Sequence, residues 1–178
     1  LKGKPGYFHY ASAGNGSSPH LSAELFKGMA GVNMNHVPYK GAGPALVDLL
    51  GGQLQLVFGS VVSSLPYHRN GRLRALALIS SQRNPMAQDL PTIAESGLPG
   101  YEFSSWFGML APAATPRPVI AKLQTVTAAA LRTPELSERL LREGSEPVGG
   151  PPAEFAAMIK ADIAKWAAVV KSRGIKAE

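Results

Sequence analysis

A loop of Gly, Ser and Asn residues, residues 12–18, leads from the first predicted strand, residues 8–13, to the first predicted helix, residues 19–31. Its small and polar members are Ser12, Gly14, Asn15, Gly16, Ser17 and Ser18. Ser18-Pro19 is typical of a helix start, with a hydroxyl N-cap and proline at the first helical position. Amide N–H groups and the positive end of the helix dipole converge there, and glycine allows a ligand to come close. The loop is therefore predicted to hold an anion, although an ordinary strand-to-helix turn would have the same composition.

Two phosphate-binding motifs are absent from this loop. No Gly-Lys-Ser/Thr sequence follows it, so it is not a Walker A loop. Gly14-x-Gly16-x-x-Pro19 lacks the third glycine of a dinucleotide-binding fingerprint, and no acidic residue ends the next predicted strand. A small anion such as a carboxylate therefore fits the loop better than an extended phosphate ligand.

Two further loops, residues 39–43 and 59–64, are built from Gly, Ser, Tyr and Lys residues and also follow predicted strands. Their candidate ligand-binding residues are Tyr39, Lys40 and Gly41 in one loop and Gly59 and Ser60 in the other. Lys40 could pair with a ligand carboxylate or could be an ordinary exposed lysine. The Tyr39 hydroxyl could donate to a ligand or the ring could simply pack, and we favour the ligand.

The remaining chemistry-bearing residues form no catalytic or metal-binding pattern. His20 lies in the first helical turn and is expected to be a buried or capping histidine, because His9, His36 and His68 are not at metal-ligand spacing from it. Asp48 is expected on a solvated helix face. The chain contains no cysteine, no suggestive Ser-His-Asp set and no G-x-S-x-G motif. We therefore expect no catalytic residue, no metal and no cofactor.

The first hundred residues alternate between predicted strands and helices. The strands are expected at residues 8–13, 34–39, 54–58 and 73–80, and the helices at residues 19–31, 44–50 and 65–70. Repeated strand–helix units with such apolar strands indicate an α/β fold with a parallel sheet covered on both faces. In such sheets the carboxyl ends of the strands share one edge, and ligands bind beyond that edge. The three candidate loops should therefore meet there.

The second part of the chain is predicted to be mainly helical. A polar stretch with a short helix at residues 93–96 is followed by an extended segment at residues 102–111, and Glu95 is a candidate structural anchor. Further helices are expected at residues 118–131, 135–142 and 152–173, with a short extended piece at residues 146–149. The change in composition places a domain boundary near residues 99–105.

The overall composition is that of an ordinary soluble globular protein. The chain has 178 residues, 45% of them apolar and 17% charged, and a net charge of +6. The basic residues are dispersed, whereas nucleic-acid binding would require a concentrated stripe with interleaved aromatic residues. No apolar run approaches the roughly 20 residues of a membrane helix. The chain starts at Leu1 without methionine or a signal peptide, and we expect a fragment or a processed chain.

Several sequence blocks, in order along nearly the whole chain, resemble the substrate-binding proteins of tripartite tricarboxylate transporters, the Bug-type receptors. The blocks are Gly14-x-Gly16-Ser17-x-x-His20-Leu21-x-x-Glu24-Leu25-Phe26, His36-Val37-Pro38-Tyr39-Lys40-Gly41, Pro44-Ala45-x-x-Asp48-Leu49-Leu50-Gly51-Gly52-Gln53, Gly71-Arg72-Leu73-Arg74-Ala75-Leu76-Ala77, Leu90-Pro91-Thr92-x-x-Glu95-x-Gly97, Trp106-x-Gly108, Ala111-Pro112 and Trp166. The Val-Pro-Tyr-Lys-Gly and Pro-Thr-x-x-Glu blocks are the most specific of these.

This resemblance implies a type II periplasmic-binding-protein fold, in which two lobes close like a Venus flytrap on a small carboxylate-bearing solute. The solute is then delivered to the membrane components of the transporter. Residues 1–103 would form most of the second, ligand-cradling lobe, and residues 104–178 would be the returning C-terminal portion of the first lobe. Half of the binding cleft would lie outside this chain. A periplasmic location, a signal peptide upstream and no catalytic activity are also implied.

The resemblance also implies roles for the candidate loops. Residues 12–18 and the helix start at Pro19 would hold a ligand carboxylate through N–H and hydroxyl donors, with Tyr39, Lys40 and Gly41 at the neighbouring strand end. Where the family usually has an aspartate after the third strand, this chain has Gly59. We therefore expect no selection of an amino-bearing ligand through that position. The ligand could be a dicarboxylate, a tricarboxylate, an aromatic acid or an amino acid.

Two other functional classes remain as alternatives. The effector-sensing domain of a transcriptional regulator can share the bilobed architecture, although this sequence shows no helix-turn-helix motif. An enzyme on the same scaffold would need a nucleophile or base constellation that the sequence lacks. A signal peptide upstream of Leu1 would support the receptor, and a DNA-binding domain there would support the regulator.

Overall fold

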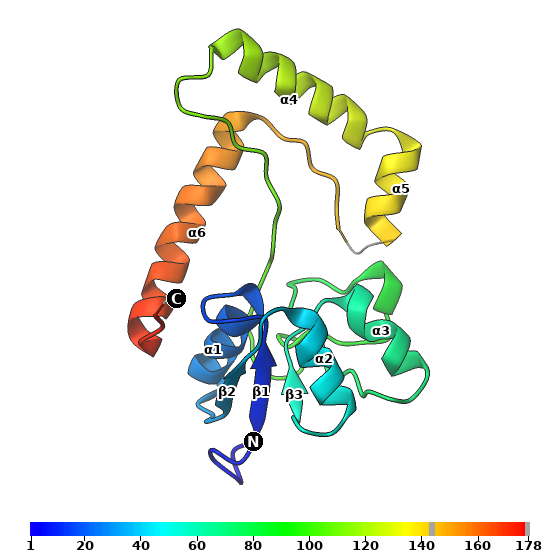
Figure 1. The fold of residues 1–178 in the computed structure, drawn as a ribbon, viewed down its shortest axis with the longest axis vertical. Coiled ribbons are helices and arrows are strands. Elements are labelled where there is room, and N and C mark those ends of the chain that lie inside the picture. Colours follow the sequence, from blue (N-terminus) through cyan, green and yellow to red (C-terminus); the bar gives the residue numbers. More distant parts are fainter. Residues whose placement is uncertain (143–144, 177–178) are drawn as a thin grey trace. The chain divides into compact units, whose positions relative to one another are not determined.

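A computed structural model describes residues 1–142 and 145–176 of the chain (Figure 1). Its elements, in chain order, are β1 (His9–Ser12), α1 (Ser18–Ala30), β2 (Asn35–Pro38), α2 (Ala42–Leu50), β3 (Leu56–Val57), α3 (Val61–Arg69), the 3-10 helix η1 (Pro85–Ala87), α4 (Arg117–Leu131), α5 (Pro134–Arg142) and α6 (Pro152–Arg173). All six long helices lie within a few residues of the segments that the sequence predicts.

The chain divides into two compact units. Unit 1 comprises residues 1–105 together with the segment that begins at Trp166, and unit 2 comprises residues 106–165. Helix α6 therefore contributes residues to both units. The assignment of residues 1–103 and 104–178 to the two lobes of a receptor stays a prediction.

Unit 1 is organised around a three-stranded parallel sheet in the order β2-β1-β3. The central strand β1 is paired with β2 over four residues, from His9 opposite Asn35 to Ser12 opposite Pro38. On its other side Tyr10 and Ala11 lie opposite Leu56 and Val57 of β3. Figure 1 shows β1 between the other two strands, with α1 and α2 as the connections between strands and α3 following β3. The predicted α/β class with a parallel sheet is confirmed.

Successive residues of β1 bury side chains on opposite faces of the sheet, as strand geometry requires. Tyr10 is fully buried and belongs to an apolar cluster with Ala23 of α1 and Met34. Ala11 is also fully buried and packs in a second cluster with Ala45 of α2 and Leu54. Helices therefore cover both faces of the central strand, which explains why Tyr10, Ala11 and Ser12 are buried in succession.

The prediction of a fourth strand at residues 73–80 is wrong. In its place the structure has a single parallel bridge between Leu78 and Thr92, and the N–H of Phe103 donates to the carbonyl of Ile79 at 2.9 Å. The backbone near Leu78 is therefore paired with the later loop and not with β3. Leu76 is 61% exposed, so the apolar run predicted as a buried strand is only partly covered.

The prediction of a short helix at residues 93–96 is also wrong, because this segment forms only a turn. Reciprocal bonds close the turn: the Thr92 N–H donates to the Glu95 carboxylate at 2.7 Å, and the Glu95 N–H donates to the Thr92 hydroxyl at 3.1 Å. This is the capping-box arrangement. Gly97, with a φ of 103°, ends the turn at once. The expectation that Glu95 is a structural anchor is confirmed by these bonds and by its ion pair with Arg83.

Unit 2 contains α4, α5 and the first part of α6, preceded by a segment without regular structure. Within this unit the indole N–H of Trp106 donates to the Asp162 carboxylate at 2.6 Å, and its ring packs edge-on against Phe155. Ala128 is the only buried side chain among the described residues of this unit. The extended segments predicted at residues 102–111 and 146–149 form no strand in the described part of the chain.

Candidate ligand-binding edge

The three candidate loops leave the same edge of the sheet of unit 1. Because β1, β2 and β3 are parallel, their carboxyl ends share one edge, and each is followed by a loop that leads into α1, α2 or α3. The first two loops are joined where they begin, since the N–H of Tyr39 donates to the Ser12 carbonyl at 3.1 Å. Gly14 also lies close to the second loop, because a Cβ added there would be 3.5 Å from the Tyr39 carbonyl oxygen. This edge is where open α/β sheets bind ligands.

The first loop, residues 12–18, is called the ligand loop below, and much of its hydrogen bonding is internal. The Ser12 hydroxyl accepts from the Gly14 N–H at 3.1 Å, and the Ser17 hydroxyl donates to the Gly14 carbonyl at 2.7 Å. The Gly16 N–H donates to Nδ1 of His20 at 3.0 Å. Ser12 is only 1% exposed, so it lies beneath the loop and not on its surface.

The start of α1 differs by one residue from the prediction. Ser17, and not Ser18, is the N-cap, with Pro19 at the second helical position, and the Ser17 hydroxyl makes no cap bond because it is turned to the loop carbonyl. The first-turn N–H groups of Ser18 and His20 have no acceptor among the described residues. These N–H groups are thus available to an anion at the positive end of the helix dipole.

The second loop ends at another helix start without a side-chain cap. Gly41 is the N-cap of α2 and has a φ of 115°, a conformation that favours glycine, and Lys40 before it is exposed. The Tyr39 hydroxyl donates to the Asp48 carboxylate of α2 at 2.7 Å. This bond raises the pKa of Tyr39 and uses its donor within the protein. The half-buried Asp48 is therefore a partner of Tyr39, not a residue of a purely solvated face.

The third loop has its polar groups satisfied locally. Ser60 is the N-cap of α3, and its hydroxyl accepts from the Ser63 N–H at 3.3 Å and lies 2.8 Å from the Ser63 hydroxyl. Gly59 is exposed, and a Cβ added there would be 3.1 Å from the Ser64 hydroxyl oxygen. The uncapped starts of α1 and α2 are therefore better placed than α3 to receive an anion.

A buried carboxylate that the sequence analysis did not single out lies behind the ligand loop. Glu24 of α1 accepts hydrogen bonds from the Tyr10 hydroxyl at 2.7 Å, from the Lys27 ammonium at 2.5 Å and from the Arg173 guanidinium at 3.0 Å. Burial alone would raise the pKa of Glu24, but these donors outweigh it and hold the pKa below its usual value. We call these four residues the Glu24 cluster. The spacing of Glu24 and Lys27 was visible in the sequence, but the contacts with Tyr10 and Arg173 join distant segments.

Two histidines form a stack beside this cluster. The rings of His20 and His36 lie 3.9 Å apart and nearly parallel, and the ring of Tyr10 lies 5.0 Å from His36. Nε2 of His36 is 2.6 Å from the Ser12 hydroxyl. His20 is 6% exposed, so the expectation of a buried or capping histidine is confirmed. His36 was not a candidate site residue in the sequence analysis, because its contact with Ser12 depends on the pairing of β2 with β1.

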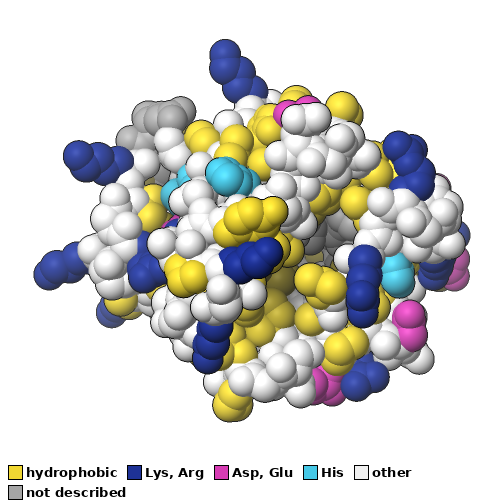
Figure 2. Space-filling model, turned by 90° about the horizontal axis from the view of Figure 1, so that it is seen from below, with side chains coloured by type: hydrophobic (Ala, Val, Ile, Leu, Met, Phe, Trp, Pro, Cys, Tyr) yellow, Lys and Arg dark blue, Asp and Glu magenta, His cyan; other side chains and the backbone are white. Residues whose placement is uncertain are grey.

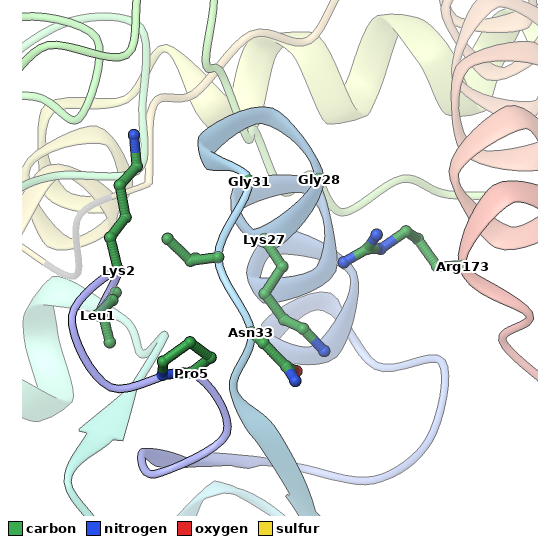
Figure 3. A pocket seen from close by; sticks show the side chains of 9 residues that line it. Leu1, Lys2, Pro5, Lys27, Gly28, Gly31, Asn33 and Arg173 are labelled. Carbon is green, nitrogen blue, oxygen red and sulfur yellow. The ribbon is translucent and has the colours of Figure 1, made fainter.

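Two pockets lie along α1. The first, about 350 Å³ in volume, is lined at the carboxyl end of the helix by residues such as Gly28, Gly31 and Lys2, together with Arg173 (Figure 3). The second, about 320 Å³, reaches the ligand loop at Asn15. Its lining residues are Asn15, His20, Glu24, Lys27, Arg173, Gly174, Ile175 and Lys176. Neither pocket includes a residue of the second or third candidate loop.

On the face drawn in Figure 2, basic side chains are not gathered in one stripe. Figure 2 shows Lys and Arg side chains scattered over the face drawn there, with fewer Asp and Glu side chains among them. Within residues 1–142 and 145–176, no three His, Asp or Glu side chains are grouped so that they could hold a metal ion. The helices described there include none with the length and apolar character needed to cross a membrane.

Comparison with known proteins decides the family. Residues 1–175 match the family described as tripartite tricarboxylate transporter family receptor. The chain belongs to this receptor family. Receptors of this family are periplasmic solute-binding proteins, not enzymes. The resemblance seen in the sequence blocks is thus confirmed.

Individual relatives agree with this assignment. BugT of Bordetella pertussis is 38% identical over 175 residues, which are 98% of this chain and 54% of BugT. A structure of Rhodopseudomonas palustris Rpa4515 with adipate is 41% identical, with a TM-score of 0.88 over 98% of this chain and 58% of that chain. MatC of R. palustris with bound malate is 33% identical, with a TM-score of 0.81 over 93% and 57%. The chain spans about half the length of most of the curated relatives that it matches.

Proposed function

We propose that this chain supplies one side of the binding site of an extracytoplasmic receptor for a small organic carboxylate. The observation that carries the proposal is the pair of uncapped helix starts, α1 and α2, at one sheet edge of a chain that belongs to this receptor family. Relatives of the same fold hold adipate and malate, two dicarboxylates. N–H groups at helix starts and a carboxylate have complementary charge and geometry.

In this proposal the ligand carboxylate is bound mainly by main-chain donors. The N–H groups of Ser18 and His20 supply donors from α1, and Asn15 lies beside them in the loop. The start of α2 at Gly41 supplies the second group of donors, and the exposed Lys40 adds positive charge nearby. The candidate residues Gly14, Gly16, Ser17, Gly59 and Ser60 then shape the loops.

The remaining parts of the proposal concern the whole protein. Residues 1–103 and 104–178 are assigned to two lobes of a periplasmic receptor that closes on its ligand and delivers it to the membrane components of a tripartite tricarboxylate transporter. The opposite side of the cleft would be supplied by sequence outside this chain. Membership of the receptor family supports this arrangement, as does the match to 54% of BugT and 58% of Rpa4515.

Thermal denaturation with matched ligands tests the proposal. We expect adipate and malate to raise the melting temperature of the protein, since a ligand at 100 times its Kd stabilises by about 2.7 kcal/mol. The neutral control is 1,6-hexanediol, which has the length of adipate without its charges and should have no effect. Stabilisation by the diol, with no effect of any carboxylate, would contradict the proposal.

Gly59 provides a test of ligand class. Malate and aspartate differ in one substituent, a hydroxyl in place of an ammonium group, and we expect the protein to bind malate in preference. A Gly59→Asp variant returns an acceptor and a negative charge to this loop, so its preference should move towards aspartate, as measured by calorimetric titration of both ligands. The Ser64 hydroxyl must shift slightly to admit the new side chain. An unchanged ratio of affinities would show that this position does not select the ligand.

A further inference from the structure

The ligand loop is held from behind by two histidines on different elements. His20 of α1 accepts the Gly16 N–H at 3.0 Å, and His36 of β2 lies 2.6 Å from the Ser12 hydroxyl, which in turn accepts the Gly14 N–H. The two rings are stacked 3.9 Å apart, so a change in one ring acts directly on the other. The backbone of the loop is thus connected at two points to one histidine pair.

We propose that His20 and His36 are positioning residues that hold the ligand loop in its binding shape, and that the loop loosens when the pair takes up a proton. This proposal rests on the proposed function only in naming residues 12–18 as the loop that receives the ligand. The hydrogen bonds from the histidines to the loop do not depend on that assignment.

The chemistry of the hydrogen bond between Gly16 and His20 explains why protonation would loosen the loop. Nδ1 of His20 can accept the Gly16 N–H only while it carries no proton of its own. Protonation at Nδ1 turns the acceptor into a donor, and the bond to the loop is lost. It also places a positive charge against the stacked ring of His36, which opposes a second charge there.

The surroundings of the pair keep both rings neutral under ordinary conditions. Burial lowers the pKa of both histidines, and the proximity of His20 contributes to lowering that of His36 to about 4. The negative charge of Glu24 raises the pKa of both histidines, but Lys27 and Arg173 offset this charge because both donate to the Glu24 carboxylate. The titratable and charged groups around the pair are Tyr10 on β1, Glu24 and Lys27 on α1, and Arg173 and Lys176 in the C-terminal segment.

Two substitutions separate hydrogen bonding from protonation. In His20→Asn the side-chain oxygen takes the place of Nδ1 and can accept the Gly16 N–H, but it does not titrate. In His36→Gln the amide reaches the place of Nε2 and can keep the bond to Ser12, again without titrating. The matched control is His68→Asn, because Nδ1 of His68 on α3 also accepts a backbone N–H, that of Ala75 at 3.4 Å, away from the ligand loop.

Hydrogen exchange of the Gly14 and Gly16 amides, measured by NMR on the whole 178-residue chain, tests the proposal. Between about pH 7 and about pH 4, we expect protection of these amides in the wild type to fall by about tenfold or more relative to the strand amides of β1. His68→Asn should behave like the wild type, whereas His20→Asn should keep the protection of the Gly16 amide throughout. Equal loss of Gly16 protection in His20→Asn, or no loss in the wild type, would overturn the proposal.

If His20→Asn does not fold, an NMR pH titration of the wild type tests the proposal instead. The side-chain resonances of His20 and the amide resonance of Gly16 should titrate with one common midpoint in the wild type, because the Gly16 N–H is bonded to His20. A Gly16 midpoint that differs from that of His20 would overturn the proposal. Adipate affinity, measured in parallel, distinguishes the two failures: absence of adipate binding with intact pH-dependent protection contradicts the proposed function alone, and binding without that dependence contradicts this inference alone.

Discussion

The two compact units of the chain differ in how far they bury their own side chains. In unit 1 both faces of β1 are covered, and Tyr10, Ala11 and Ala23 are fully buried. In unit 2 the described residues leave Phe107 95% exposed and Leu110 77% exposed. The core of unit 1 fixes the positions of its loops. The exposed apolar side chains of unit 2 leave surface available for further packing. The hydrogen bonds described for the ligand loop join it to His20 and His36 of unit 1.

The polar contacts of the two units show the same contrast. Glu24 in unit 1 is buried and accepts from three side chains at once, so its charge depends on all of them. Asp162 in unit 2 makes an exposed bond with Trp106. Removing a partner from a buried charge network costs much more than removing an exposed contact. Matched substitutions in the two units should therefore differ in their effect on stability.

The largest effect is expected for Glu24→Leu. This substitution leaves Lys27 and Arg173 without their shared carboxylate, and the free energy of unfolding of unit 1 should fall by about 3–5 kcal/mol. Urea denaturation measures this fall in a Trp106→Phe background. In that background Trp166 is the remaining tryptophan, and it reports on unit 1. The matched variant in unit 2, Asp162→Leu, followed by circular dichroism, should cost about 1 kcal/mol or less. Equal costs for the two variants would remove the distinction between the units.

The apolar side chains give the next largest effect. Met34 is 1% exposed, and Met34→Ala should lower the free energy of unfolding by about 2–4 kcal/mol because it leaves a cavity in the core of unit 1. Phe107→Ala removes a larger but exposed side chain from unit 2, and the change should stay within about 0.5 kcal/mol. Denaturant unfolding of the two variants measures both changes in the free energy of unfolding. A large cost for Phe107→Ala would show that this ring is packed in solution.

A smaller effect is expected from pH. The pKa of His36 is about 4 in the folded protein against 6.5 as its ordinary value, so the unfolded chain binds more protons between these two pH values. This histidine therefore contributes stability that is present above about pH 6.5 and is lost as pH falls towards about 4, by about 2–3 kcal/mol in all. Urea midpoints across this range should fall, and His36→Gln should reduce the fall. A wild-type profile that is flat between these values would contradict the burial of this ring.

Local sequence signals account for much of the fold. Apolar periodicity, glycine stops and proline starts located the long helices and the three paired strands, because these features act within one segment. The predicted strand at residues 73–80 was wrong because its backbone partners, Thr92 and Phe103, come from later loops. The N-cap at Ser17 was missed because its hydroxyl is turned to a loop carbonyl.

The candidate site was predictable in its position but not in its internal bonding. Parallel strands require that the three loops share an edge, and sequence order was sufficient to predict it. Which donors remain available depends on contacts between distant segments: Gly16 is bonded to His20, and Tyr39 to Asp48. The stack of His20 and His36 and the link from Arg173 to Glu24 depend on strand pairing and helix packing, which no single segment encodes.

The most direct test of the central claim is an NMR titration of the protein with adipate and, separately, with 1,6-hexanediol. The claim is that the loops at the carboxyl edge of β1 and β2 bind a carboxylate through helix-start N–H groups. We expect adipate to shift the amide resonances of Ser18, His20 and Gly41 most strongly, with little change in unit 2 and no response to the diol. Shifts confined to other residues, or an equal response to the neutral diol, would contradict the claim.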